Sequence, residues 1–215
     1  YLFSVAPPGY RADVEPLRVP PSRPGFPPTH ALLEESWQRY LDAMEQLLAA
    51  QPYLLGERFT AADASAYGQL SMNLIDPTTA ARLQQLAPLT HRWLLAIRDG
   101  RHCGSSGALT LAPALRPLLA IVMQTFAPLM AQNERAYLRA HAAGETLFNE
   151  AAFNRGRALY DGELLGRPFR SSAKTFQVRV WRELCRQWRE LDPSTRGALE
   201  SMVPDARLLS GSEAL

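Results

Sequence analysis

The chain contains little cysteine and almost no lysine. Its two cysteines, Cys103 and Cys185, lie far apart and belong to no Cys-x-x-Cys or Cys/His cluster. We therefore expect neither a disulfide framework nor a zinc site, and the pattern favours a reducing cytosol. Lys174 is the only lysine among 23 basic residues, and a formal net charge of +2 gives no reason to expect a nucleic-acid or membrane partner.

Long apolar runs and common catalytic motifs are also missing. The longest apolar segment, residues 109–130, is interrupted by three prolines and an arginine, so we expect no transmembrane helix. No Gly-x-Gly-x-x-Gly, Walker or His-Glu-x-x-His pattern occurs. The chain begins at Tyr1 without the features of a signal peptide, and we expect it to be the downstream part of a longer protein.

The composition is that of an ordinary globular protein, with 47% hydrophobic and 20% charged residues. Residues 1–28 are rich in proline and predict an arm or linker, since proline cannot continue a helix. From Thr29 onwards apolar residues recur at helical spacing. This spacing predicts helices over residues 29–51, 60–74, 78–86 and 88–98, a glycine- and serine-rich loop over 99–107, and a long helix over 114–143 that bends at Pro128.

Residues 145–170 differ, because several glycines separate short stretches there. The sequence Tyr160-Asp161-Gly162-Glu163 carries an Asp-Gly turn signal and predicts a small β-hairpin. Helix returns at Ser171 or Ser172 and continues to about Leu191, with apolar residues at fourfold spacing: Phe176, Val180, Leu184 and Trp188. Asp192-Pro193 begins a last helix that ends near Val203.

These elements predict an all-α bundle with a small β-hairpin insertion before the last long helix. We divide the chain into a proline-rich arm (1–28), a helical domain (29–112), a helical extension with its hairpin near 145–170 (113–203), and a flexible tail (204–215).

The most informative segment is Tyr53 to Tyr67, YLLGERFTAADASAY. Thr60 can serve as a structural N-cap with Asp63 at the third helical position, which predicts a capping box. Gly56 permits the tight turn before this helix. A capping box alone is a weak signal, because many helices have one.

The whole arrangement resembles the buried central helix of the glutathione S-transferase C-terminal domain. A Leu-Leu-Gly-x-Arg-x-Thr turn precedes a capped, alanine-rich helix that begins with Ala-Asp. The similarity continues in Tyr67-Gly68-Gln69-Leu70, in Asp76-Pro77, and in Ala87-Pro88 followed by Trp93. It extends from about Phe26 to Asp99. Phe169-Arg170 and Ala173-Lys174 resemble the hairpin-to-helix junction of bacterial homologues with a C-terminal extension.

The resemblance implies a function for the parent protein and a limit for this chain. Proteins of the family bind glutathione mainly through an N-terminal thioredoxin-like domain, which also supplies the catalytic residue. No such domain can be recognised before Thr29. The resemblance thus implies a cytoplasmic, bacterial glutathione transferase that acts on small apolar electrophiles. It is also compatible with a homodimer. It implies no catalytic residue, no metal and no activity in this chain alone.

The resemblance further places parts of the central helix near the pocket for the apolar co-substrate. The candidate pocket residues are Tyr67, Gln69, Met72, Asn73 and Asp76. Core packing is the alternative for Tyr67 and Met72, and capping of the helix end is the alternative for Asn73 and Asp76.

Other features favour structural interpretations. His102-Cys103 lies in a glycine-serine loop that offers no rigid orienting base, so we expect no nucleophile there. The arginines at 179, 182, 186 and 189 alternate with Glu183 and Glu190, which favours a solvated face or an interhelical salt-bridge seam over nucleic-acid binding. Two alternatives to an enzyme fragment remain: a non-catalytic scaffold or binding module, and a regulatory domain whose loop at 99–107 responds to a ligand.

Overall fold

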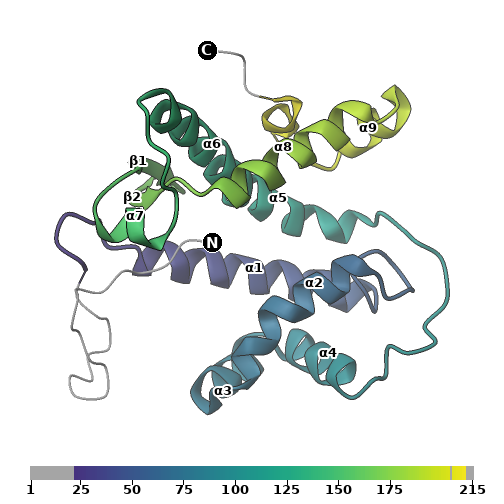
Figure 1. Cartoon of the computed structure of the whole chain (residues 1–215). Coiled ribbons are helices and arrows are strands. Elements are labelled where there is room, and N and C mark those ends of the chain that lie inside the picture. Colours follow the sequence, from purple (N-terminus) through teal and green to yellow (C-terminus); the bar gives the residue numbers. More distant parts are fainter. Residues whose placement is uncertain (1–21, 204, 212–215) are drawn as a thin grey trace. The chain divides into compact units, whose positions relative to one another are not determined.

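The computed structural model describes residues 22–203 and 205–211 (Figure 1). This part of the chain is mostly helical with one two-stranded hairpin, which confirms the predicted fold class. The first half contains α1 (His30–Ala50), α2 (Ala61–Leu70), the 3-10 helix η1 (Ser71–Leu74), α3 (Pro77–Leu86) and α4 (Pro88–Arg98). The second half contains η2 (Pro113–Leu115), α5 (Arg116–Gln124), α6 (Phe126–Ala142), α7 (Glu150–Asn154), β1 (Leu159–Leu164), β2 (Arg167–Ser172), α8 (Thr175–Glu190), α9 (Pro193–Glu200) and η3 (Ala206–Ser210).

The chain divides into two compact units. We call residues 37–121 the capped-helix unit, and residues 1–36 together with 122–215 the hairpin unit. These boundaries differ from the predicted ones at 28/29 and 112/113, because α1 and α5 each contribute residues to both units. Most of the predicted proline-rich arm, residues 1–21, lies outside the described residues.

The capped-helix unit has the helices that the sequence predicts. Proline occupies the first position of both α3 and α4, where its missing amide hydrogen costs no helical bond. A side chain from α1 completes the start of α4: the Glu45 carboxylate accepts hydrogen bonds from the Leu89 amide (3.0 Å), the Thr90 amide (2.6 Å) and the Thr90 hydroxyl (2.7 Å). Two amides that lack a helical partner are thereby paired, and a negative charge lies at a helix N-terminus.

The predicted long helix over 114–143 is interrupted, and the predicted bend at Pro128 is wrong in position. The interruption lies at Thr125, between α5 and α6, where φ is −125° and ψ is −65°. Pro128 lies in the first turn of α6. It cannot donate to the carbonyl of Gln124, and its ring would collide with that carbonyl in a continuous helix. The break therefore falls on the N-terminal side of the proline.

By length and composition alone, Pro113–Ala142 is the one stretch of the described helices that could cross a membrane. This is weak evidence, because core helices of folded domains pass the same test. The stretch comprises η2, α5 and α6 rather than one helix, and α6 packs against α8.

The hairpin forms, but its turn is not the predicted one. Asp161 and Gly162 lie within β1, and the two-residue turn is Leu165-Gly166, with φ values of 50° and 70°. Positive φ at both positions is the geometry of the type I′ turn, which matches the twist of paired strands. The Asp161 side chain instead pairs across the hairpin with Arg170, at 2.6 and 2.8 Å.

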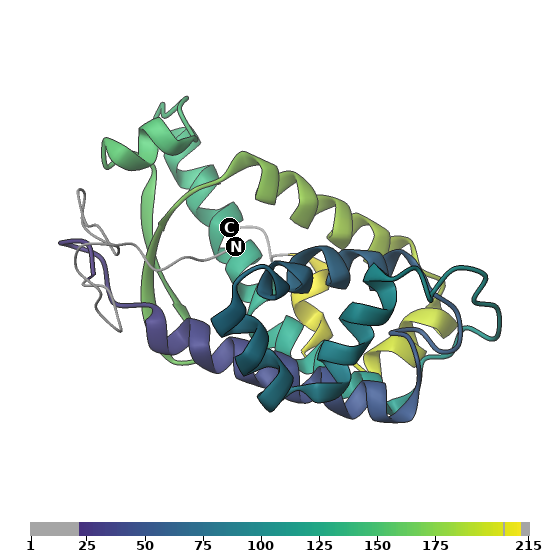
Figure 2. The same cartoon turned by 90° about the horizontal axis from the view of Figure 1, so that it is seen from below.

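Two adjacent polar residues of α6 hold the hairpin from outside. The Gln132 amide accepts from the Glu163 backbone amide and donates to the Glu163 carbonyl, both at 2.9 Å. Asn133 makes the same pair of bonds with Lys174, at 2.8 and 3.0 Å, and it is fully buried. Gln132 thus pairs with the backbone of β1 as a neighbouring strand would, and Asn133 binds the backbone between β2 and α8. Figure 2 shows the hairpin extending towards the start of α1, where Arg167 contacts Glu35 at 2.8 Å.

Helix α8 begins at Thr175, later than predicted, because Ser171 and Ser172 belong to β2. Its buried face differs in part: Phe176 is 61% exposed, whereas Trp188 is buried together with Gln177, Val178, Trp181 and Cys185. Strict fourfold spacing drifts by about 40° per step around a helix, so such a series leaves the buried face. Within the predicted tail, the described residues 205–211 include η3, with Ala206 and Leu209 buried.

Gly162 generates the first prediction, because a side chain at this position would collide with the fully buried Phe169. An added Cβ would lie 2.5 Å from the Phe169 ring. We expect Gly162→Ala to lower the free energy of unfolding by about 1–3 kcal/mol, the usual cost of overpacking. Chemical denaturation followed by circular dichroism measures this. The control is Gly197→Ala in α9, where a Cβ meets nothing within 4 Å and should raise stability by up to about 1 kcal/mol. Equal effects of the two substitutions would contradict the packing argument.

Candidate functional site

The structural centre of the capped-helix unit is the carboxylate of Asp63, which is fully buried. One of its oxygens accepts a hydrogen bond from the Leu54 amide at 2.7 Å. The other accepts from the Thr60 amide at 2.9 Å and the Thr60 hydroxyl at 2.8 Å. Thr60 is the N-cap residue of α2 and Asp63 is its third residue, as predicted. The carboxylate thus ties the start of α2 to the turn that follows α1.

The turn itself depends on Gly56. Its φ is +106°, and an added Cβ would lie 2.6 Å from the carbonyl oxygen of Ala108. That close approach belongs to a short backbone pairing between Gly56 and Leu109. The glycine-serine loop is anchored on the same turn, since the Phe59 amide donates to the Ser105 hydroxyl at 3.0 Å. The end of this loop is therefore held in place rather than free.

The expectation that Thr60 to Leu74 is a buried central helix is only half correct. The segment is helical throughout, as α2 and η1, but only Asp63 and Leu70 of α2 are buried. In the described residues α2 packs mainly against η1 and α4, and its remaining side chains are small. The outer side of α2 is exposed because no other described element covers it.

The predicted pocket residues lie along this exposed segment. Gln69, Met72 and Asp76 are exposed, and Tyr67 and Asn73 are half-buried. None of the five lines either of the two hollows described below. For Asp76 the structure shows the capping role, since its carboxylate accepts from the amides of Thr78 (2.7 Å) and Thr79 (3.0 Å). These bonds lower the pKa of Asp76. Asn73 donates to the Leu70 carbonyl at 3.0 Å.

A hollow of about 330 Å³ lies elsewhere in the capped-helix unit, and we call it the α4 hollow. One face of α4 forms much of its wall, and the rest comes from the end of α1, the following turn and the loop after α4. Its lining residues are Leu48, Pro52, Tyr53, Leu89, Arg92, Trp93, Ala96, Ile97, Arg101 and His102. The sequence analysis placed Leu89, Trp93 and Ile97 on one helix face but did not identify a cavity there.

The His102-Cys103 pair lacks the geometry of a nucleophile and its base. The Cys103 sulfur lies 4.0 Å from the His102 ring nitrogen, and Cys103 is exposed. The His102 ring instead packs on Phe59, with 4.3 Å between ring centroids. Cys185 is buried in α8, and burial raises the pKa of its thiol. Among residues 22–203 and 205–211, no three His, Cys, Asp or Glu side chains gather as metal ligands.

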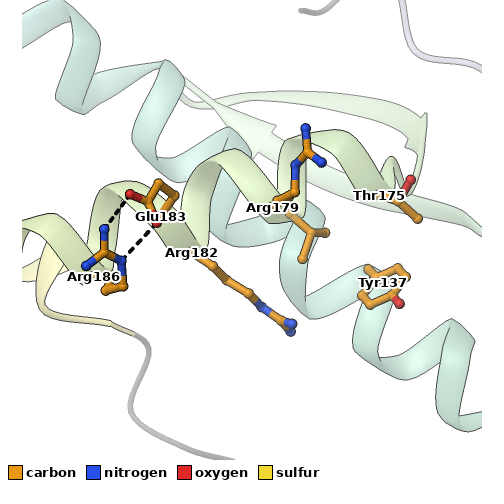
Figure 3. A pocket seen from close by; sticks show the side chains of 7 residues that line it. Tyr137, Thr175, Arg179, Arg182, Glu183 and Arg186 are labelled. Atoms are coloured by element: carbon orange, nitrogen blue, oxygen red, sulfur yellow. Dashed lines mark hydrogen bonds and ion pairs between the residues drawn. The ribbon is translucent and has the colours of Figure 1, made fainter.

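A second hollow, of about 380 Å³, lies between α6 and α8 in the hairpin unit (Figure 3). It is lined by Tyr137, Thr175, Val178, Arg179, Arg182, Glu183 and Arg186. Two of its arginines are already paired: Arg186 with Glu183 and Glu190, and Arg182 with Glu134 of α6. The arginine-rich face of α8 thus has features of both structural interpretations: the pairs of Arg186 lie within α8 on an exposed face, and Arg182 with Glu134 joins two helices.

The hydrogen bonds of Asp63 predict that its loss destabilises the fold much more than the loss of Asp76, the capping residue of α3. Asp63→Ala leaves the buried Leu54 amide and the Thr60 amide without an acceptor, so we expect a loss of at least about 2 kcal/mol in unfolding free energy. Asp76→Ala removes an exposed cap and should cost about 1 kcal/mol. Asp63→Asn should also destabilise, because Asp63 uses both of its oxygens as acceptors. Urea denaturation of the three variants measures the order, and similar losses for the two alanine variants would contradict the role of burial.

The ion pair between Arg186 and Glu183 predicts a low pKa for the Glu183 carboxyl group. The Arg186 guanidinium, with help from the Gln187 amide, lowers the pKa of Glu183 to about 2. Glu183 should therefore remain ionised until the pH falls to about 2. In Arg186→Gln its pKa should rise towards 4.5, its ordinary value. A pH titration of the Glu183 carboxyl carbon by NMR measures both values, with Arg189→Gln as the control that leaves the pair intact. An unchanged pKa in Arg186→Gln would mean that the pair does not form in solution.

Comparison with known protein families gives a match for one segment of the chain. Residues 27–96 match the model of the family "Glutathione S-transferase, C-terminal domain". No curated protein and no solved structure matches the chain. The matched segment contains α1 to most of α4, the Asp63 network and the exposed α2–η1 segment, and it agrees closely with the range from Phe26 to Asp99 in which the sequence motifs lie. Residues 27–96 are therefore similar to the glutathione S-transferase C-terminal domain, and this match supports the family resemblance of that segment.

Proposed function

We propose that this chain supplies the co-substrate-binding and dimerisation part of a bacterial, cytoplasmic glutathione-transferase-like enzyme that acts on small apolar electrophiles. The observation that supports this most is an exposed apolar surface on the family domain. Met72 and Ile75, at the end of the α2–η1 segment, are 63% and 72% exposed. Large apolar side chains exposed next to one another favour contact with a ligand or another protein surface.

The proposed role of these residues is to hold the electrophile by apolar contact. In the conjugation reaction, the glutathione thiol loses its proton and the sulfur forms a bond to an electrophilic carbon, whose leaving group departs with the bonding electron pair. By the family resemblance, a thioredoxin-like domain would lower the pKa of that thiol. The β-strands within residues 22–203 and 205–211 are only the two of the hairpin, so no thioredoxin-like sheet is part of the described structure. This chain would contribute proximity.

One observation favours the alternative of a non-catalytic binding module. The exposed positions of α2 include Ala61, Ala64, Ser65 and Gly68, all with small side chains. Such a surface allows another backbone to approach closely without displacing large groups. The same surface would then bind a protein partner, whether or not the parent protein has enzymatic activity.

The test is conjugation of glutathione to 1-chloro-2,4-dinitrobenzene by the complete gene product, including any coding sequence that precedes Tyr1. We expect a glutathione-dependent rate from the complete protein and none from these 215 residues alone. Met72→Ala should lower kcat/KM about fivefold, mainly through KM, since it removes about 1 kcal/mol of apolar contact. Leu138→Ala, at an exposed leucine of α6, is the matched control and should leave the rate unchanged.

Two results would contradict the proposal in different ways. A complete protein with neither a glutathione-dependent rate nor retention on glutathione resin would favour the binding module. Conjugation by the 215-residue chain alone would show that the active site lies within it.

A further inference from the structure

The α4 hollow combines an apolar wall with two cations. Leu89, Trp93 and Ile97 recur every four residues on one face of α4, and Leu48, Pro52 and Tyr53 close the other side. Its volume of about 330 Å³ is at the lower end of the range for small-molecule sites, which is roughly 300–1,000 Å³. The hollow is therefore large enough for a ligand with a single or fused ring.

The charges around this hollow are of one sign. Arg92, Arg101 and His102 line it, and none of the ten lining residues is acidic. Within the described part of the chain, Arg92 makes no ion pair. The nearest carboxylate to Arg101 is Asp99, at a long 3.5 Å, and Asp99 is held more closely by Arg98 at 2.9 Å. Because guanidinium groups match carboxylates in shape and charge, the hollow favours an anionic group.

Two polar atoms of the lining residues are also buried without a hydrogen-bond partner. These are Nε1 of Trp93, which is only 7% exposed, and Nδ1 of His102. An indole nitrogen can only donate, so it requires an acceptor, and a carboxylate offers acceptor oxygens alone. Among the described residues only five side-chain atoms are buried without a partner, and two of them belong to residues that line this hollow.

The residues that carry these groups are held in place. The His102 ring lies on Phe59, and the loop that carries Arg101 and His102 is fastened to the same turn by the bond from the Phe59 amide to the Ser105 hydroxyl. Arg58 adds a bond to the Gly107 carbonyl at 3.2 Å. The loop is thus an ordered wall of the hollow, which a bound ligand would contact directly.

We propose that the α4 hollow binds a small aromatic carboxylic acid. Its ring occupies the apolar wall formed by Leu89, Trp93 and Ile97, and its carboxylate is bound by Arg92 and Arg101 and accepts a hydrogen bond from Trp93. This inference goes beyond the proposed function and does not depend on it, because it involves neither glutathione nor the exposed α2–η1 segment.

Isothermal titration calorimetry with the 215-residue chain tests the proposal, with 1-naphthoate as the probe and neutral 1-naphthamide as its uncharged counterpart. We expect naphthoate to bind about tenfold more tightly, because charge-assisted hydrogen bonds are roughly twice as strong as neutral ones. Arg92→Gln and Arg101→Gln should each reduce this preference several-fold. Arg139→Gln, at an exposed arginine of α6, is the matched control and should leave it unchanged.

A second measurement locates the ligand. The indole N–H signal of Trp93 in an NMR spectrum, assigned by its loss in Trp93→Phe, should shift when naphthoate is added and shift less with naphthamide. Trp93→Phe keeps an aromatic ring but removes the donor, so it should weaken naphthoate binding several-fold. Circular dichroism shows that each variant is folded. Equal affinities for acid and amide, an unchanged preference in the Arg92→Gln/Arg101→Gln double variant, or no shift of the Trp93 signal would overturn the proposal.

Discussion

The carboxylate of Asp63 is the interaction on which the capped-helix unit depends. It is fully buried and accepts three hydrogen bonds, from the amide of Leu54 and from the amide and hydroxyl of Thr60. Burying a carboxylate is costly unless its oxygens are paired, and here the pairing groups belong to the turn that leads into α2. The turn, the helix start and the charge are therefore stable only together. Because Gly56 of the same turn pairs with the segment after the glycine-serine loop, the position of that loop depends on this network as well.

The same principle operates at three other places where a backbone end would lack a partner. Glu45 binds the first amides of α4, Gln132 binds the backbone of β1, and Asn133 binds the backbone between β2 and α8. In each case a polar side chain on one helix satisfies backbone groups of an element that is distant in sequence. Buried backbone groups rarely remain unpaired, so these residues determine which elements can lie next to one another. Some charged side chains are thus already paired within the fold: Glu45 accepts from Thr90, and Glu183 accepts from Arg186. The arginines of the α4 hollow differ, because none of the residues that line it is acidic.

Local rules account for what could be predicted from the sequence. Caps, prolines and apolar periodicity are properties of neighbouring residues, and they predicted α1, α3, α4 and α9 within a few residues. The failures involve partners that are remote in sequence. The Asp161-Gly162 turn signal was overridden because Asp161 pairs with Arg170 and Gly162 must accommodate the Phe169 ring. The burial of α2 was overestimated because burial requires another element that covers the helix. The sequence of the helix itself does not show whether such an element is present. The α4 hollow was not predicted because three separate segments form it, and the signal that could have suggested it was Arg92 beside Trp93 on an otherwise apolar face.

The two surfaces of the capped-helix unit differ in chemistry, and this difference bears on what each can bind. The exposed α2–η1 segment offers small and apolar side chains, with Met72 and Ile75 as its largest groups and no arginine, lysine or histidine from residue 60 to residue 76. A neutral electrophile or an apolar protein surface suits it, since an ionised ligand would lose hydration there without gaining a counter-charge. The α4 hollow has the opposite property, because its arginines and the unpaired indole N–H of Trp93 could replace the hydration that an anion loses. On the proposals above, a ligand that carries both a ring and a carboxylate should therefore prefer the α4 hollow to the α2–η1 segment, because only the hollow offers a counter-charge.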